Sequence, residues 1–283
     1  MGKIIAIANQ KGGVGKTTTA VNLCASLAAA EKRTLLVDMD PQANSVSGLG
    51  VDKHAVELSV YEVLLDANLV ETAIVDTQLE YLFLLPANEQ LTGAEIDLVG
   101  FERREFRLKQ ALEKIRGHFD YIFVDSPPSL GLLTLNTLTA ADSVLIPLQC
   151  EYYALEGLGQ LLETIKLVQT NLNPTLDIEG VLLTMFDRRL KLAKQVVDET
   201  ISYFGDKVYD TIIPRNVKLS ESPSFGKPIL LYDVECQGAK TYLKLAREVI
   251  QSVKESAGTG SRSTDTPIGE ESGGGRAGNA HPG

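Results

Sequence analysis

The chain has 283 residues, of which 44% are hydrophobic and 23% charged, and its formal net charge is −10. This composition is that of an ordinary globular protein with enough chain for a sizeable core. The three cysteines, Cys24, Cys150 and Cys236, lie far apart, which excludes a disulfide framework and a zinc module and favours a reducing cytoplasm. No apolar run is long enough to span a bilayer. The acidic balance argues against a protein coated in basic residues but leaves room for a local basic face.

Short runs that are apolar on both faces alternate with helical patterns along the chain. Because strands covered by helices on two sides are apolar on both faces, this alternation predicts an α/β fold with a twisted, mostly parallel sheet and helices on both faces. The predicted strands are Lys3–Asn9, Thr34–Asp38, Leu82–Leu85, Tyr121–Asp125, Ser143–Pro147 and Ile178–Thr184. The clearest helical faces lie within 20–28, 108–115 and 245–253.

One domain is predicted over residues 1–255, which contain no internal repeat or linker. The remaining segment, Ser256–Gly283, consists mostly of Gly, Ser, Thr and Pro, with Ile268 as its only large aliphatic residue. Such a segment cannot bury enough apolar surface to offset its ordering entropy, so we predict a disordered tail. Cys24 falls on the apolar face of the first helix and is predicted to be a core residue rather than a reactive thiol.

A glycine-rich run, Gln10-Lys-Gly-Gly-Val-Gly-Lys-Thr-Thr18, follows the first strand and opens the first helix. Glycines let successive backbone N–H groups point inward at a phosphate, and the helix N-terminus adds its positive end. Lys16 can supply a charge for the β- and γ-phosphates, and the Thr17 hydroxyl can ligate Mg²⁺. The predicted phosphate-binding residues are Lys11, Gly12, Gly13, Val14, Gly15, Lys16, Thr17 and Thr18.

Carboxylates follow two of the predicted strands. Because the carboxyl ends of parallel strands meet at one edge of a sheet, these groups are expected to converge on the glycine-rich loop. Asp125 ends a Walker-B-like strand and is the candidate Mg²⁺ partner, through water. Asp38 and Asp40 end the second strand, where Asp38 either caps the strand end or contacts the loop.

The loop departs from the standard P-loop pattern, because Gln10 replaces the first glycine and Lys11 adds a second cation. In this it resembles the deviant Walker-A ATPases, the ParA/MinD group of P-loop NTPases. The resemblance implies ATP and Mg²⁺ as ligands, and an ATP-dependent homodimer in which Lys11 reaches the partner's nucleotide. It also implies that Asp40 positions the hydrolytic water. Lys11, Lys16 and Asp40 are therefore the predicted catalytic residues.

A second segment, which begins Ile213-Pro-Arg-Asn216 and continues to Ser224, resembles chromosomal ParA (Soj-type) proteins. The similarity extends from residue 3 to about residue 255 and implies that Pro214 and Asn216 hold the adenine. It further implies a cytoplasmic, nucleoid-associated protein that partitions chromosomes or plasmids. A ParB-type centromere-binding protein would stimulate its ATPase.

Two cationic stretches stand out against the acidic total, one at 186–194 and one at 213–228. In a dimer they could neutralise several phosphates of double-stranded DNA, which would give affinity without sequence preference. Arg215 and Lys218 could face either the nucleotide or the DNA. The predicted DNA-binding residues are Arg188, Arg189, Lys191, Lys218 and Lys227.

Several alternatives remain open at the level of sequence. A MinD-like regulator of the division site would need a lipid-binding helix, and the predicted tail offers no amphipathic pattern for a membrane. A carrier of metal clusters would need paired thiolates near the dimer axis. An ATPase that positions a protein cargo without DNA, and a P-loop kinase or ligase, would share the same loop. Residues 50–100 hold no recognisable chemistry.

Overall fold

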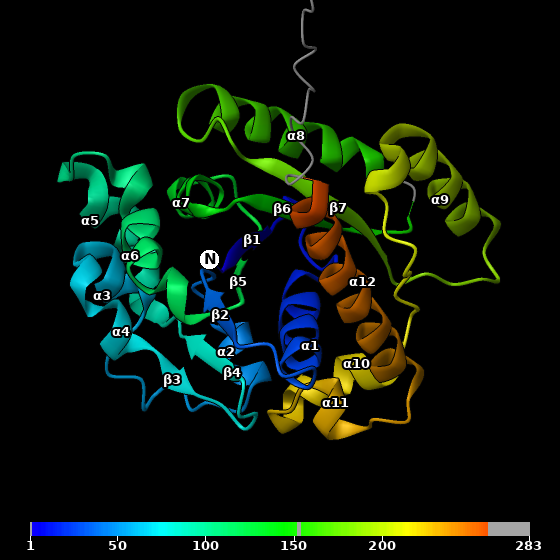
Figure 1. Cartoon of the computed structure of the whole chain (residues 1–283), viewed down its shortest axis with the longest axis horizontal. Coiled ribbons are helices and arrows are strands. Elements are labelled where there is room, and N and C mark those ends of the chain that lie inside the picture. The colour runs from blue at the N-terminus through cyan, green and yellow to red at the C-terminus, as the bar shows by residue number, and fades with distance from the viewer. Residues whose placement is uncertain (1, 152–153, 260–283) are drawn as a thin grey trace, which may run out of the picture. The chain divides into compact units, whose positions relative to one another are not determined.

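A computed structural model describes residues 2–151 and 154–259 (Figure 1). The strands are β1 (Lys3–Ile7), β2 (Thr34–Asp38), β3 (Val75–Asp76), β4 (Leu82–Leu85), β5 (Tyr121–Asp125), β6 (Ser143–Gln149) and β7 (Asp177–Thr184). The α-helices are α1 (Lys16–Ala28), α2 (Asn44–Gly48), α3 (Val60–Leu65), α4 (Val70–Ala73), α5 (Ala94–Asp97), α6 (Arg107–Ile115), α7 (Leu132–Ala140), α8 (Ala154–Asn171), α9 (Lys191–Phe204), α10 (Val217–Glu221), α11 (Ile229–Tyr232) and α12 (Gln237–Thr259).

The strands form one sheet in the order β3-β4-β2-β5-β1-β6-β7. All neighbours are parallel except β3 and β4, which confirms the predicted mostly parallel sheet and each of its predicted strands. Only β3 was not predicted, because two residues are too short to show a pattern. β1 is an inner strand of the sheet, paired with β5 on one side and β6 on the other.

Helices cover both faces of the sheet, as the apolar strands predict. Figure 1 shows α1 on one face and α7 and α8 on the other. The strand residues Ile4 and Ile7 of β1 are at most 1% exposed, and Leu23 and Cys24 of α1 are fully buried. Cys24 is therefore a core residue, as predicted.

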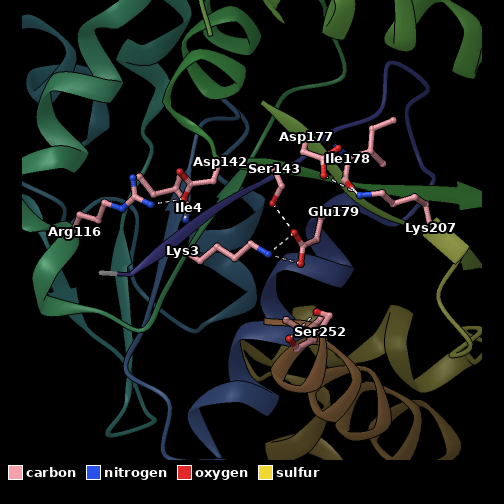
Figure 2. A network of polar contacts seen from close by, with 11 residues as sticks. Lys3, Ile4, Arg116, Asp142, Ser143, Asp177, Ile178, Glu179, Lys207 and Ser252 are labelled. Atoms are coloured by element: carbon pink, nitrogen blue, oxygen red, sulfur yellow. Dashed lines mark hydrogen bonds and ion pairs between the residues drawn. The ribbon is translucent and has the colours of Figure 1, made fainter. Parts of the chain in front are cut away.

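Ion pairs and hydrogen bonds between side chains connect β1, β6 and β7 at the edge of the sheet where these strands begin (Figure 2). Lys3 Nζ lies 2.7 Å from Glu179 Oε2, and the Ser143 hydroxyl donates to the same oxygen at 2.6 Å. Beside them, Arg116 Nη2 pairs with Asp142 Oδ2 at 2.6 Å. These pairs lie where β1, β6 and β7 begin, so the glycine-rich loop that follows β1 is at the opposite edge of the sheet.

The segment at 50–100, for which only the strand Leu82–Leu85 was predicted, also contains β3 and the short helices α3, α4 and α5, with several 3₁₀ turns. A capping box starts α3: the Ser59 hydroxyl accepts from Tyr61 N at 3.1 Å, and Glu62 Oε2 accepts from Ser59 N at 2.7 Å. This Ser-x-x-Glu signal was present in the sequence.

The chain divides into two compact units, Met1–Glu248 and Val249–Gly283, and α12 crosses the boundary. The helix runs to Thr259, three residues past the start of the predicted tail, Ser256–Gly283. The rest of that tail lies outside the described residues, so its disorder and the domain limit at residue 255 stay predictions.

Candidate nucleotide site

The glycine-rich loop joins β1 to α1 at the open edge of the sheet. Gly13 and Gly15 have φ angles of +73° and +92°, a region that side chains rarely adopt. A Cβ atom on Gly12 or Gly13 would meet nothing within 4 Å, so the space beside the loop is open to a ligand. Gly15 is the N-cap of α1, which points the helix N-terminus into that space.

Two neighbouring strands hold the loop in place. The Asn9 carboxamide accepts from Lys11 N at 3.0 Å and donates to the Pro147 carbonyl of β6 at 2.7 Å. The Thr184 hydroxyl at the end of β7 donates to the Val14 carbonyl at 2.8 Å. Neither Asn9 nor Thr184 was among the predicted site residues, although both directly follow or end predicted strands.

Lys16 is 7% exposed, and its Nζ donates to the Lys11 carbonyl at 3.3 Å. Burial lowers its pKa, while the charges of Asp125 and Asp40 oppose the change. A buried ammonium whose nearest acceptor is one backbone carbonyl is suited to bind phosphate oxygens.

Asp125, at the end of β5, is fully buried. Its Oδ2 accepts from the Ser45 hydroxyl at 2.9 Å, whereas Oδ1 has no hydrogen-bond partner among the described residues. Burial raises the pKa of Asp125 to about 6, and the Thr17 and Ser45 hydroxyls and the Lys16 charge oppose the rise. An unpartnered buried carboxylate oxygen near Thr17 and Lys16 fits a water bound to Mg²⁺.

Asp38 holds the start of α2. Its two oxygens accept from the backbone N–H groups of Asp40, Ser45 and Val46 at 3.0, 3.1 and 3.3 Å. Burial first and the neighbouring Asp125 second raise the pKa of Asp38 well above its usual value. Of the two roles left open by the sequence, the hydrogen bonds support the first: Asp38 caps the end of its own strand through Asp40 N, and in addition it caps the start of α2.

Asp40 is 8% exposed and accepts from Gln42 N at 3.0 Å, in a turn that leads to Ala43. Ala43 has a φ of +53°, a strained conformation for a residue with a Cβ. The turn borders a cavity of about 540 Å³, whose wall also includes Lys53, His54, Asn88, Glu89, Gln90 and Thr92. Part of segment 50–100 thus lines a cavity beside the turn that follows Asp40.

A second cavity, of about 130 Å³, lies on the other side of the loop. Asn216, which lines this cavity, uses its Oδ1 to cap α10 through Lys218 N at 2.9 Å. Met185, which was not predicted, has a φ of +52° at this cavity. The lining includes Gly15, Thr18, Thr184, Met185, Pro214, Asn216 and Ser220. The structure therefore brings the predicted base-holding residues to the loop.

The first cationic stretch lies between β7 and α9. Arg189 forms a bidentate ion pair with Asp187, with Nε–Oδ1 at 2.9 Å and Nη2–Oδ2 at 2.6 Å. Hydrogen bonds from Arg189 lower the pKa of Asp187 to about 2. Arg188 precedes this arginine, and Lys191 begins α9. Two backbone hydrogen bonds place this stretch beside segment 213–215.

The other predicted DNA-binding residues lie in different surroundings. Lys218, on α10, pairs with Asp233. Lys227 lines a cavity of about 260 Å³ that also includes Thr17, Thr18 and Asn44. Arg215 and Lys11 both approach Glu151, at 3.5 and 3.7 Å. Arg215 therefore lies beside the loop lysine, whereas Lys218 points to a different carboxylate.

The chain is similar to known proteins over most of its length. A family model described as an AAA domain matches residues 2–178. The chain is 62% identical over 249 residues to the sporulation initiation inhibitor protein Soj of Bacillus subtilis, covering 88% of this chain and 98% of that protein. It is 59% identical over 251 residues to the chromosome partitioning protein ParA of Myxococcus xanthus, covering 89% of each.

Solved structures show the same fold. A cobyrinic acid a,c-diamide synthase from Mycobacterium smegmatis, with a bound ATP analogue and magnesium, superposes with a TM-score of 0.80 at 40% identity, over 90% of this chain and 97% of that one. The septum site-determining protein MinD of Pyrococcus horikoshii, complexed with Mg-ADP, gives a TM-score of 0.72 at 27% identity, over 89% and 98%.

Proposed function

Because the chain belongs to the ParA/Soj family of chromosome-partitioning ATPases, we propose that ATP binding and hydrolysis switch its affinity for DNA. In this proposal the ATP-loaded protein is a homodimer that holds double-stranded DNA without sequence preference, and hydrolysis releases it. The observation that carries the proposal is the pair of lysines, Lys11 and Lys16, on one glycine-rich loop, together with the buried carboxylate of Asp125.

The position of each site residue indicates its role in ATP binding and hydrolysis. The backbone of 12–17 and the Lys16 ammonium bind the phosphates, and Pro214 and Asn216 hold the base. Thr17 and, through water, Asp125 would hold Mg²⁺, which would supply positive charge to offset that of the phosphates. Asp40 orients the attacking water. Lys11 crosses to the second subunit, so the site is complete only in the dimer.

DNA binding is assigned to Arg188, Arg189, Lys191, Lys218 and Lys227, which would contact phosphates. The activating partner is a ParB-type centromere-binding protein, and the protein acts in the cytoplasm on the nucleoid. Across the described residues, none of the helices has the length and apolar character needed to cross a membrane.

The test is retention of a random-sequence DNA duplex with no nucleotide, with ADP and with ATP·Mg²⁺, at two salt concentrations. Tight, salt-sensitive binding only with ATP·Mg²⁺ supports the proposal. ATP-dependent dimerisation without DNA binding in any state would favour an ATPase that positions a protein cargo instead.

Asp40→Ala separates binding from hydrolysis. Because the phosphate-binding loop is intact, this variant is expected to bind ATP, dimerise and stay on DNA, while turnover falls by about 100-fold or more, as for other groups that act in proton transfer. Turnover is followed by phosphate release and residence by gel retardation. Normal turnover would refute the assignment of Asp40.

A further inference from the structure

Glu151, just beyond the end of β6, lies between two cations of the nucleotide site. Its Oε2 is 3.7 Å from Lys11 Nζ, and its Oε1 is 3.5 Å from Arg215 Nη2. The Gln149 carboxamide donates to Oε1 at 2.5 Å, and Glu151 N donates back to the Gln149 carbonyl at 2.8 Å. The carboxylate is thereby held in place by its own strand.

The two cations come from different segments of the chain. Lys11 belongs to the phosphate-binding loop, and Arg215 lies between the predicted base-holding residues Pro214 and Asn216. The Glu151 carboxylate is thus the counter-ion of Lys11 and Arg215, a place that the negative charge of a nucleotide would otherwise take. It also keeps the Lys11 ammonium directed at its own subunit.

We propose that Glu151 is a positioning residue that holds Lys11 within its own subunit and so opposes pairing of two ATP-loaded subunits. This inference rests on the proposed dimer, in which Lys11 must leave Glu151 to reach the partner's phosphates. A phosphate offers the ammonium more charge than one carboxylate, so the exchange of partners is favourable only when a nucleotide-loaded subunit is near.

The effect is expected to be modest. The Lys11 and Glu151 side chains are 36% and 48% exposed, and ion pairs in such surroundings are weak. Glu151→Gln keeps the shape and the contact with Gln149 but removes the charge. It is expected to lower the protein concentration at which half of the ATP-loaded chains are dimeric by about two- to five-fold.

A matched control is available at the start of α12. Glu235 pairs with Lys240 at 2.9 Å with both side chains exposed, so Glu235→Gln changes the net charge equally and also frees one lysine. Any effect of total charge on association appears in both variants, whereas release of Lys11 appears only in Glu151→Gln.

The first measurement needs no dimer: the acylation rate of Lys11 by an amine-reactive ester, read by mass spectrometry in nucleotide-free protein. We expect Lys11 to react about two- to five-fold faster in Glu151→Gln than in wild type, and only Lys240 to respond in Glu235→Gln. An unchanged Lys11 rate would overturn the proposal, whatever the oligomeric state.

The second measurement is light scattering against protein concentration with ATP·Mg²⁺. A lower half-point in Glu151→Gln alone supports the proposal. An unchanged or higher half-point overturns it, because Glu151 would then be neutral or would support the dimer. If the wild type itself stays monomeric with ATP·Mg²⁺, the proposed dimer fails, while the acylation rates still report the contact between Glu151 and Lys11.

Discussion

Asp38 and Asp125, two neighbouring buried carboxylates, dominate the electrostatics of the site at the scale of single residues. Each has a raised pKa, and burial is the largest cause for both. Hydrogen bonds from Ser45, through its backbone to Asp38 and through its hydroxyl to Asp125, keep the two groups in place. The nucleotide-free protein thus keeps these two buried carboxylates at a cost in folding stability, which a bound cation would offset.

Asp125→Asn is expected to stabilise the nucleotide-free protein in a pH-dependent way. The folded pKa of about 6 lies above the ordinary carboxyl value of 3.8, so folding favours the protonated carboxyl and stability falls as pH rises from about 4 to about 6. Above about pH 7 the carboxyl is ionised and its full cost in folding free energy applies. The neutral amide of the variant removes that cost, which stabilises the folded protein by on the order of 2 kcal/mol. Thermal melts in EDTA at pH 8 and pH 4.5 check this. A gain of equal size at both pH values would contradict the assigned cause.

At the scale of elements, the end of α2 packs tightly against the loop that follows the 3₁₀ turn η7 (Ser222–Phe225). Gly50 has a φ of +73°, and a Cβ there would lie 2.5 Å from the Gly226 carbonyl oxygen. Gln78 Nε2 donates to the Leu49 and Gly226 carbonyls at 3.3 and 3.0 Å. Through these contacts the helix capped by Asp38 meets the loop that carries Lys227.

Gly50→Ala is therefore expected to destabilise the protein by more than the conformational cost alone. Gly13→Ala is the matched control, because Gly13 has the same φ of +73° but open space around it. We expect a loss of about 1 kcal/mol for Gly13→Ala and about 2–4 kcal/mol for Gly50→Ala, measured by urea unfolding without nucleotide. Equal losses would mean that the loop moves aside freely.

The network in Figure 2 leads to a second expectation for the sheet. Glu179→Ala leaves Lys3 and the buried Ser143 hydroxyl without their acceptor, so stability should fall by about 1–3 kcal/mol. ATP affinity should not change, because the five residues of β1 place the loop about 15 Å away. Asp177→Ala, which breaks the exposed pair with Lys207, is the control and should cost about 0.5 kcal/mol or less. Weaker ATP binding in Glu179→Ala would show that the two edges are coupled.

At the scale of the whole molecule, a protein with a net charge of −10 is proposed to hold a polyanion. Local cations must then overcome a repulsive background. Two of them, Arg189 and Lys218, are partly neutralised by Asp187 and Asp233 of the same chain. DNA phosphates would have to displace these carboxylates, which lowers the affinity and keeps the binding reversible.

Asp187→Asn is expected to strengthen DNA retention with ATP·Mg²⁺ by about two- to five-fold, because Arg189 no longer has a competing carboxylate. The measurement is duplex retention over a range of salt concentrations. Asp198→Asn on α9 changes the net charge equally, and its carboxylate forms no ion pair with the described residues, so it should have a smaller effect. Equal effects of both variants would assign the change to net charge alone.

The amino-acid pattern alone was enough to predict the fold class, the strands at the centre of the sheet and the glycine-rich loop proposed to bind phosphate. These features depend on residues within a few positions of one another: apolar runs, glycines before a helix, and a carboxylate at a strand end. Such local patterns survive without knowledge of the rest of the chain.

The contacts that support the site, in contrast, became visible only in the folded chain. Ser45 and Asp125 are 80 residues apart in the chain, and Thr184 and Val14 are 170 apart, yet both pairs are hydrogen bonded. The contact between Lys11 and Glu151 likewise joins segments that are distant in the chain, because these residues follow the neighbouring strands β1 and β6. Such pairs depend on strand order and register, which bring distant segments together, and no local pattern encodes which polar side chains will then face each other.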